Sequence, residues 1–192
     1  MKKVKCRKQD SNLQALIKKE NKRPLSYEML EKLVPKWARV TKYDALAKFK
    51  TLKQALQGKE MMVVLYNVHD RISRKLVNMP GHFIVINARA SGQPTEYFSS
   101  SGWGPAQEIA KTHSDPNIFK RLLGKNFITN SVQFEGRGDA NTCWRWCLAR
   151  CILGNIPLKQ FQQLFNKKLH IDEKDDCITL MTLLITANKE LE

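Results

Sequence analysis

The segment from Asn141 to Cys151, which reads NTCWRWCLARC, predicts a helix that begins at a cysteine. Cys143 stands at the expected start of the helix, directly behind the capping-type pair Asn141-Thr142. Cys147 and Cys151 follow one and two turns later on the same face, where small apolar thiols commonly pack against a sheet. We therefore expect this helix to lie centrally, packed against a sheet.

Strands for that sheet are expected upstream of the helix. Met61–Val68 and His82–Ala88 are apolar runs typical of central strands, and Glu96-Tyr97-Phe98 is a third strand candidate after a turn. The stretch 127–134 alternates in polarity and leads towards Cys143 as a fourth candidate.

Helices are expected between and after these strands. Helical spacing and end signals place them at Tyr27–Val34, Asp44–Gln57, a short segment opening at Pro105, Asp115–Leu123, Leu158–Phe165 and Asp175–Glu190. The pattern predicts an α+β fold in which a central mixed sheet is flanked by helices. We divide the chain into a basic N-terminal extension, residues 1–24, and one domain, residues 25–192.

Composition limits the class of protein. The chain has 192 residues, 42% of them hydrophobic and 27% charged, which fits one soluble globular domain. The longest apolar run, Met61–Tyr66, is far too short to span a bilayer, and no apolar stretch follows the basic start Met1–Lys8. We expect no membrane partner and a protein that is not secreted.

The cysteines are expected to be thiols. There are five of them, and three share one helix face at a spacing that is poor for disulfides: Cys6, Cys143, Cys147, Cys151 and Cys177. No CxxC pair exists and the histidines are scattered, so no metal site is predicted.

The net charge of +15 indicates a polyanionic partner. Lysine and arginine are spread along the chain, and no zinc finger, RNP sequence or phosphate-binding loop accompanies them. The charge therefore predicts a nucleic-acid-associated protein, with solubility and non-specific adhesion as the alternative.

Three residues suggest a cysteine hydrolase. The thiol of Cys143 would meet the unpaired N–H groups of a helix N-terminus, which favour the thiolate. His82, at the start of a strand, could hold that thiolate and later deliver a proton, and the amide of Gln133 is a suitable donor for an oxyanion. A helix-start cysteine taken alone is more often structural, so the order of the surrounding residues matters.

That order resembles the adenovirus-type cysteine proteases, whose wider clan includes the proteases that remove small ubiquitin-like modifiers. The corresponding pieces are Gly81-His82-Phe83, then Tyr97 through Gly102, then Gln133 through Trp144. The sequence is most similar to the branch found in virophages and Polinton-type elements, on these segments: Thr142-Cys143-Trp144-Arg145, Leu148-Ala149-Arg150, Leu158-Lys159-Gln160-Phe161 and Asp175-Asp176-Cys177-Ile178-Thr179. The similarity spans about Asp44 to Leu184.

The sequence departs from this family where the family has an acid. Ser99 occupies that position and cannot carry a charge to orient His82. A cysteine–histidine pair can work without a strong third member, because a thiol acidifies more easily than a hydroxyl. Ser99 is expected to hold the ring through its hydroxyl, with Asn87, Glu96 or water as the alternatives.

The resemblance implies a papain-like fold and a viral endopeptidase that trims capsid or other virion proteins during maturation. Cys143 would be the nucleophile, His82 the proton carrier, and Gln133 with the Cys143 N–H the oxyanion hole. No cofactor is needed for this chemistry, although DNA or a viral peptide could activate the enzyme. We expect a monomer in the host cytoplasm, virus factory and virion interior. An isopeptidase for ubiquitin-like modifiers and a basic DNA-binding virion protein with a degenerate protease fold are the alternatives.

Overall fold

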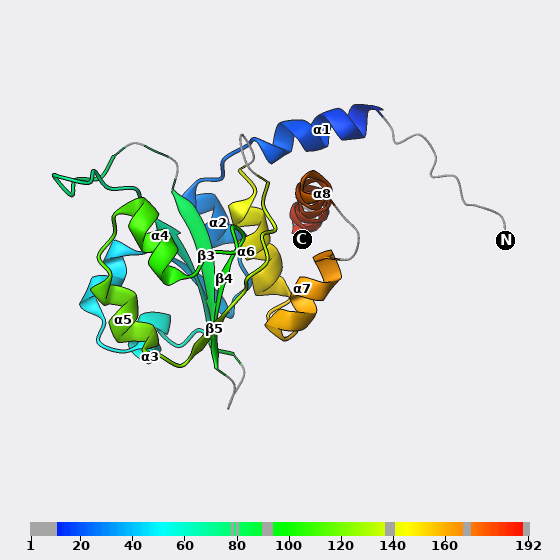
Figure 1. Ribbon diagram of the computed structural model, residues 1–192. Helices are drawn as coiled ribbons and strands as arrows, with labels where there is room; N and C mark the ends of the chain where they lie inside the picture. Colours follow the sequence, from blue (N-terminus) through cyan, green and yellow to red (C-terminus); the bar gives the residue numbers. More distant parts are fainter. Residues whose placement is uncertain are drawn as a thin grey trace.

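A five-stranded mixed sheet forms the centre of the protein (Figure 1). The structure is a computed structural model that describes residues 11–77, 79, 81–89, 94–136, 141–166 and 170–189. The strands follow the order of the chain across the sheet: β1 (Ala38–Lys42), β2 (Met61–Tyr66), β3 (His82–Asn87), β4 (Thr95–Ser99) and β5 (Phe127–Thr129). The three central strands are antiparallel, whereas β1 and β5 run parallel to their neighbours at the two edges.

Both faces of the sheet are covered, which explains why its central strands are apolar without a break. On β2, Met61 and Val63 belong to one core, and Met62 and Val64 belong to the other. Successive side chains of a strand point to opposite faces, so a strand between two cores needs apolar residues at every position. The same division continues across β3 and β4.

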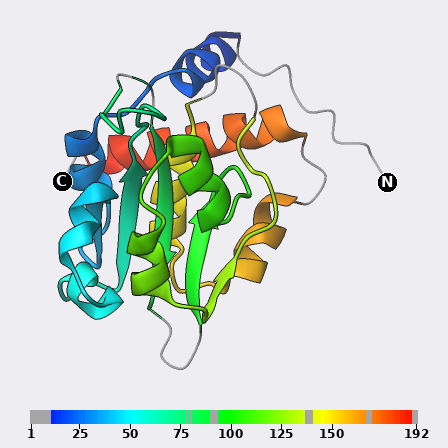
Figure 2. The same cartoon turned by 60° about the vertical axis from the view of Figure 1, so that its left-hand side comes forward.

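The helices form two groups, one on each face (Figures 1 and 2). The first group is α2 (Tyr27–Leu33), α6 (Cys143–Ile152), α7 (Leu158–Asn166) and α8 (Ile171–Lys189), with α6 against β3. The second group is the 3₁₀ helix η1 (Asp44–Lys48), α3 (Leu52–Leu56), α4 (Pro105–Thr112) and α5 (Asn117–Leu123). The predicted α+β fold, with one mixed sheet between helices, is confirmed.

Some predicted elements are wrong in their extent. The helix expected over Asp44–Gln57 is broken after η1, because Thr51 starts a new helix by exchanging capping hydrogen bonds with Gln54. The strand expected over 127–134 ends at Thr129, because the side chain of Asn130 takes over both hydrogen bonds with the Ser99 backbone. Strand β1 was not predicted, and α8 begins four residues earlier than expected.

Helix α1 (Ser11–Asn21) lies in the segment interpreted as a basic extension. Its Glu20 forms a buried ion pair with Arg145 of α6, at 3.1 Å, and its Asn21 bonds to Asp176 and Thr179 of α8. The part of residues 1–24 that the structure describes thus packs on the first helix group, and the domain boundary at residue 25 stays a prediction. No helix in the described ranges is long and apolar enough to cross a membrane.

Candidate active site

His82 occupies the first position of β3, where the strand enters the sheet beside Tyr66 of β2. The residue before it must be glycine on steric grounds. A Cβ atom on Gly81 would lie 2.2 Å from the backbone oxygen of Tyr66, which is far inside contact distance. The close approach of the Gly81 backbone to β2 therefore sets the position from which the His82 ring projects.

The ring of His82 is held through its Nε2 atom. This atom lies 3.1 Å from the Ser99 hydroxyl of β4 and 3.3 Å from Oε1 of Glu108 on α4. Ser99 donates its own hydroxyl hydrogen to the same Glu108 oxygen at 2.7 Å. With the Ser99 hydrogen committed to Glu108, the Nε2–H group is the donor of the ring, and Nδ1 is left as the basic nitrogen.

Glu108 was not predicted, and it supplies the acid that Ser99 lacks. The residue lies in the first turn of α4, where an acidic side chain usually complements the helix dipole at the surface. Here only 1% of it is exposed. The available signal was its place one turn after Pro105 in a helix that follows the Ser99 loop, but sequence alone did not show that this face turns inward.

The other two residues considered for this role lie elsewhere. Asn87 and Glu96 pair with each other at the opposite end of β3 and β4. Glu96 there forms a buried ion pair with Arg150 of α6 and accepts the N–H of Leu158. Both residues fix the far end of the α6 helix to the sheet, so the proposal that either of them orients His82 is wrong.

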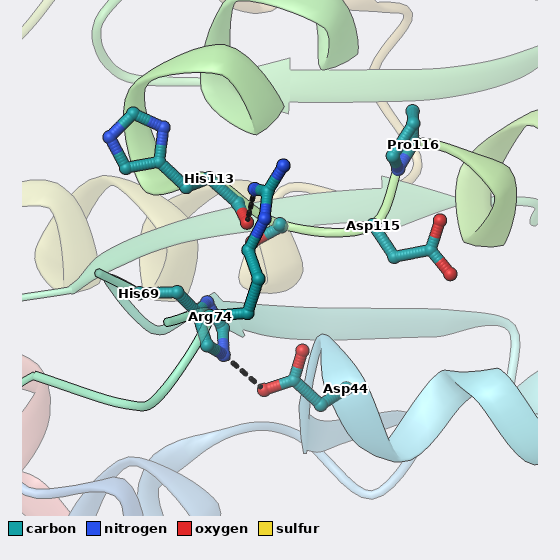
Figure 3. A pocket seen from close by; sticks show the side chains of 7 residues that line it. Asp44, His69, Arg74, His113, Asp115 and Pro116 are labelled. Carbon is teal, nitrogen blue, oxygen red and sulfur yellow. Dashed lines mark hydrogen bonds and ion pairs between the residues drawn. The ribbon is translucent and has the colours of Figure 1, made fainter. Parts of the chain in front are cut away.

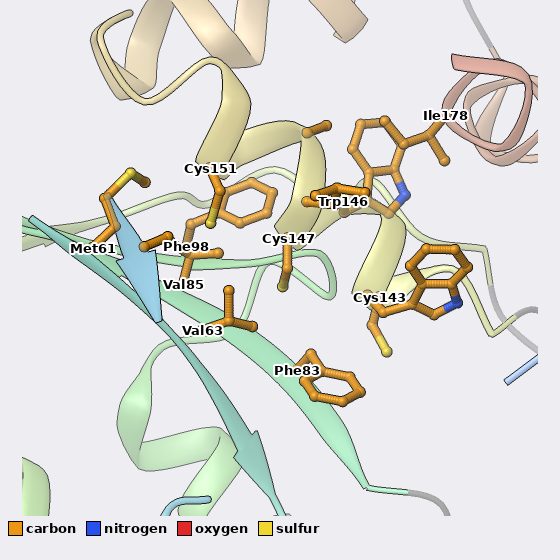
Figure 4. Packing of buried hydrophobic residues seen from close by; sticks show 14 of the residues in the cluster. Met61, Val63, Phe83, Val85, Phe98, Cys143, Trp146, Cys147, Cys151 and Ile178 are labelled. Atoms are coloured by element: carbon orange, nitrogen blue, oxygen red, sulfur yellow. The ribbon is translucent and has the colours of Figure 1, made fainter. Parts of the chain in front are cut away.

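Cys143 is the first residue of α6, and its thiol faces the end of β3 near Phe83 (Figure 4). Cys147 and Cys151 follow along the helix, fully buried against the sheet as predicted. The Cys143 Sγ atom, a ring nitrogen of His82 and a carboxylate oxygen of Glu135 all lie within 4.8 Å of one another. A cavity of about 480 Å³ opens onto all three of these residues.

Burial disfavours the charged forms of both partners, which argues against the thiolate expected from the helix N-terminus alone. Burial, and then the neighbouring Glu135 carboxylate, raise the pKa of the Cys143 thiol well above its ordinary value, despite hydrogen bonds from backbone groups of Phe83 and Trp144. Burial and the charge of Lys111 lower the pKa of His82 to about 4. The arrangement therefore suits a neutral imidazole that takes the thiol proton as attack begins.

The observed cap of α6 also differs from the one that the sequence predicts. Thr142 uses its hydroxyl on Asp175, at 2.5 Å, instead of on the helix end. The free N–H groups of Thr142 and Cys143 both donate to Oε1 of Glu135, at 3.1 Å each. Glu135 is thus the cap of this helix, although it lies outside it in sequence.

Gln133 lines the same cavity, and one of its two amide hydrogens is used within its own segment. Its Nε2 atom donates to the backbone oxygen of Glu135 at 2.9 Å. The role of Gln133 as an oxyanion donor stays a prediction, and in this structure the Cys143 N–H donates to Oε1 of Glu135 at 3.1 Å. Residues 137–140, in the turn between Gln133 and Cys143, lie outside the described residues.

In the described part of the chain, one group of side chains has a spacing that could hold a metal ion. It consists of His82, Glu135 and Cys143. Both carboxylate oxygens of Glu135 already accept hydrogen bonds, from Ser100 and from the two helix N–H groups. A metal ion would have to displace them and deprotonate the thiol, so the arrangement fits proton transfer better than metal storage.

A second pocket, of about 390 Å³, lies around His69 (Figure 3). His69 is half-buried, its Nε2 atom lies 3.3 Å from the Asp44 carboxylate, and Arg74 donates to the backbone oxygen of His113. These contacts join the 66–77 loop to η1 and α4. Ser114 also lines the pocket, and its hydroxyl is hydrogen-bonded to that of Thr112 at 2.8 Å.

Comparison with known proteins gives distant structural neighbours only. No family model matches the chain, and the search of curated proteins gives no match. The fold is similar to the C-terminal Ulp1 protease domain in complex with Smt3, the yeast ortholog of SUMO, with a TM-score of 0.41 and 9% identity over 94% of this chain and 96% of that one. It is also similar to the SUMO protease Ulp1 with its catalytic cysteine oxidised to a sulfinic acid, with a TM-score of 0.39 and 9% identity over 94% and 96%. At these values the similarity says nothing about the reaction.

Proposed function

We propose that the protein is a cysteine peptidase with Cys143 as nucleophile and His82 as general base. The observation that carries the proposal is the Cys143–His82 pair at the cavity, with the Nε2 atom of His82 bound to Ser99 and Glu108. A thiol, a base within reach of it and a group that orients the base are the parts that nucleophilic acyl transfer needs.

In the proposed reaction these residues act in turn. The Cys143 sulfur attacks the substrate carbonyl carbon while the thiol proton passes to His82, and the carbonyl electron pair moves to oxygen. The tetrahedral intermediate collapses to a thioester as His82 returns the proton to the leaving amine. Water, deprotonated by His82, then hydrolyses the thioester and regenerates the thiol. Glu108 stabilises the imidazolium that forms at both stages.

We further propose a protein substrate of the virion-precursor type, on the resemblance carried by the segments around His82 and Cys143. The rival proposal, a degenerate protease fold that only binds DNA, was motivated by the missing acid at Ser99. That argument no longer holds, because the Glu108 carboxylate lies beside the same histidine. A role for DNA or a peptide as activator stays a proposal that the net charge of +15 supports.

The test is peptide cleavage followed by mass spectrometry, with a library of peptides derived from capsid precursors and a SUMO-type conjugate as separate substrates. Cys143→Ala should lose all cleavage, and Cys177→Ala, which removes an exposed thiol, should keep it. Cleavage of the conjugate alone would favour the isopeptidase alternative. No cleavage of either substrate by the wild type, with and without DNA, would overturn the proposal.

A further inference from the structure

Glu135 is a buried carboxylate with both oxygens occupied, and only 9% of the residue is exposed. Its Oε2 atom accepts the Ser100 hydroxyl at 2.8 Å. Its Oε1 atom accepts two backbone N–H groups, those of Thr142 and Cys143, at 3.1 Å each. A carboxylate oxygen therefore sits on the N–H group of the nucleophile itself.

That position is the one the substrate oxygen needs. When Cys143 attacks a carbonyl, the developing oxyanion is stabilised by donors 2.7–3.1 Å away, and the N–H of the nucleophile is such a donor. Glu135 Oε1 lies at this distance from the Cys143 N–H. An ionised carboxylate there excludes the carbonyl oxygen and repels the negative charge that the intermediate would carry.

We propose that Glu135 closes the oxyanion hole of the resting protein, and that acyl transfer at Cys143 requires this carboxyl group to be neutralised or moved aside. The inference rests on the proposed peptidase function and adds the step that controls it. Gln133, whose amide is bound to the Glu135 backbone, is positioned to follow any displacement of this segment.

The charged groups around Glu135 come from four elements. His82 on β3 and Cys143 on α6 face it across the cavity, with Glu108 of α4 behind His82. On α8, Asp175 holds the Gly136 N–H and Lys174 contacts the Gln133 backbone oxygen. Burial, and then the Asp175 charge, raise the pKa of Glu135 to about 7, against the hydrogen bonds from Ser100, Thr142 and Cys143. Both forms are therefore available near neutral pH.

The first experiment compares the pH profile of kcat/KM for wild type and Glu135→Gln between pH 5.5 and 9. The amide has the same shape and no charge. We expect the wild-type activity to decline above about pH 7 and the variant to keep its activity there. The expected gain at pH 8 is about tenfold, because pH 8 lies one unit above the Glu135 pKa of about 7 and leaves about a tenth of the wild type protonated. Ser100→Ala removes a donor that favours the charged form, so its decline should shift to higher pH.

The second experiment does not depend on turnover. A peptide aldehyde adds the Cys143 sulfur to its carbonyl carbon and places an oxygen in the oxyanion hole, whereas iodoacetamide alkylates the same sulfur and forms no oxyanion. Glu135→Gln lowers the thiol pKa and so accelerates both reactions. We expect the aldehyde affinity of Glu135→Gln at pH 8 to rise by a clearly larger factor than its alkylation rate. Because only the aldehyde adduct places an oxygen in the oxyanion hole, the difference between the two factors measures the effect of Glu135 on that hole.

Glu28→Gln, which neutralises an exposed carboxylate on α2, is the matched control and should change neither quantity. Equal gains for aldehyde and iodoacetamide would overturn the proposal, as would a Glu135→Gln profile that falls with that of the wild type above pH 7. Should no peptide be cleaved by any variant, the aldehyde comparison still decides about Glu135, while the peptidase function alone is lost.

Discussion

The carboxylate of Glu108 on α4 lies 3.3 Å from the Nε2 atom of His82 on β3, and the Ser99 hydroxyl bonds to both. Burial raises the pKa of Glu108 to about 7, although Ser99 and Lys111 favour its charged form. Its Oε2 atom is buried with no partner among the described residues. Keeping Glu108 ionised in the resting protein is therefore costly in free energy. When His82 takes up a proton, the imidazolium becomes a counterion for this carboxylate.

Removing this acid should slow the chemical step rather than substrate binding. For Glu108→Ala we expect kcat to fall by about 10- to 100-fold with KM little changed, because general-base catalysis contributes about 10²–10⁴-fold and losing the group that orients the base removes part of it. Glu108→Gln should keep the ring orientation and restore part of kcat, with an altered pH profile. The check is kcat and KM measured across pH for both variants. Equal losses in the two variants at all pH values would point to a structural role instead.

Ser99→Ala separates the hydroxyl from the acid. Because Glu108 reaches Nε2 without help, we expect less than about a tenfold loss of kcat in this variant. A double-mutant cycle of Ser99→Ala with Glu108→Ala should give a coupling energy near that of one charge-assisted hydrogen bond, about 1.5–3 kcal/mol. A Ser99→Ala loss as large as that of Glu108→Ala would contradict this order of importance.

Much of this fold could be predicted from sequence, because β2, β3 and α6 are locally consistent. Their apolar periodicity predicted the strand and the helix that carry His82 and Cys143. The structure brings these two residues to one cavity, and their catalytic roles stay predictions. Glu108 and Glu135 could not be found in this way. Each is an acidic residue in a segment that is typical of the surface, and only the tertiary packing of α4 and of the segment after β5 turns it inward. The Ser99 hydroxyl lies 3.1 Å from His82 Nε2, its role stays a prediction, and the acid beside it comes from another element.

The glycine before His82 gives a steric test of the site. In Gly81→Ala the new Cβ would lie 2.2 Å from the Tyr66 oxygen, so β2 and β3 must separate at the end that carries His82. We expect lower thermal stability and a loss of activity greater than the loss of folded protein. Gly104→Ala is the matched control, since a Cβ there meets nothing within 4 Å. Circular dichroism and kcat/KM together make the comparison, and unchanged activity in folded Gly81→Ala would show that His82 tolerates this shift.

Helix α1 should stabilise the α6 helix through one buried ion pair. Arg145 donates to the Glu20 carboxylate at 3.1 Å and to Thr182 at 2.6 Å, and it is 1% exposed. Glu20→Ala leaves this guanidinium buried without its counterion, which typically costs about 3–5 kcal/mol. Chemical denaturation measures the loss of unfolding free energy. Glu31→Ala, an exposed carboxylate on α2, should cost less than about 0.5 kcal/mol. Similar small effects of both changes would mean that this ion pair adds nothing to stability.

The raised pKa of Glu108 also predicts how stability depends on pH. Its carboxyl group titrates at about 7 in the folded protein and near 4.5 otherwise, so between these values the folded state binds more protons than the unfolded state. The stability that this group contributes is therefore complete below about pH 4.5 and is lost as pH rises through about 7. The difference in unfolding free energy between wild type and Glu108→Gln should fall across that window by about 2–3 kcal/mol, at 1.36 kcal/mol for each pKa unit.

Denaturation at pH 4.5, 6 and 8 measures this difference. His82, whose pKa is lowered to about 4, gains stability in the opposite direction as pH rises, but it is present in both proteins and largely cancels. Asp70→Asn provides the control of opposite sign, because hydrogen bonds from Ser73 hold the Asp70 pKa below its ordinary value and its contribution is lost as pH falls. The opposite outcome is an unfolding free energy of the wild type that rises relative to that of Glu108→Gln between pH 4.5 and 7. It would show that Glu108 is charged in the resting protein. The neutral Cys143–His82 pair would then have to be replaced by a thiolate–imidazolium pair that this charge stabilises.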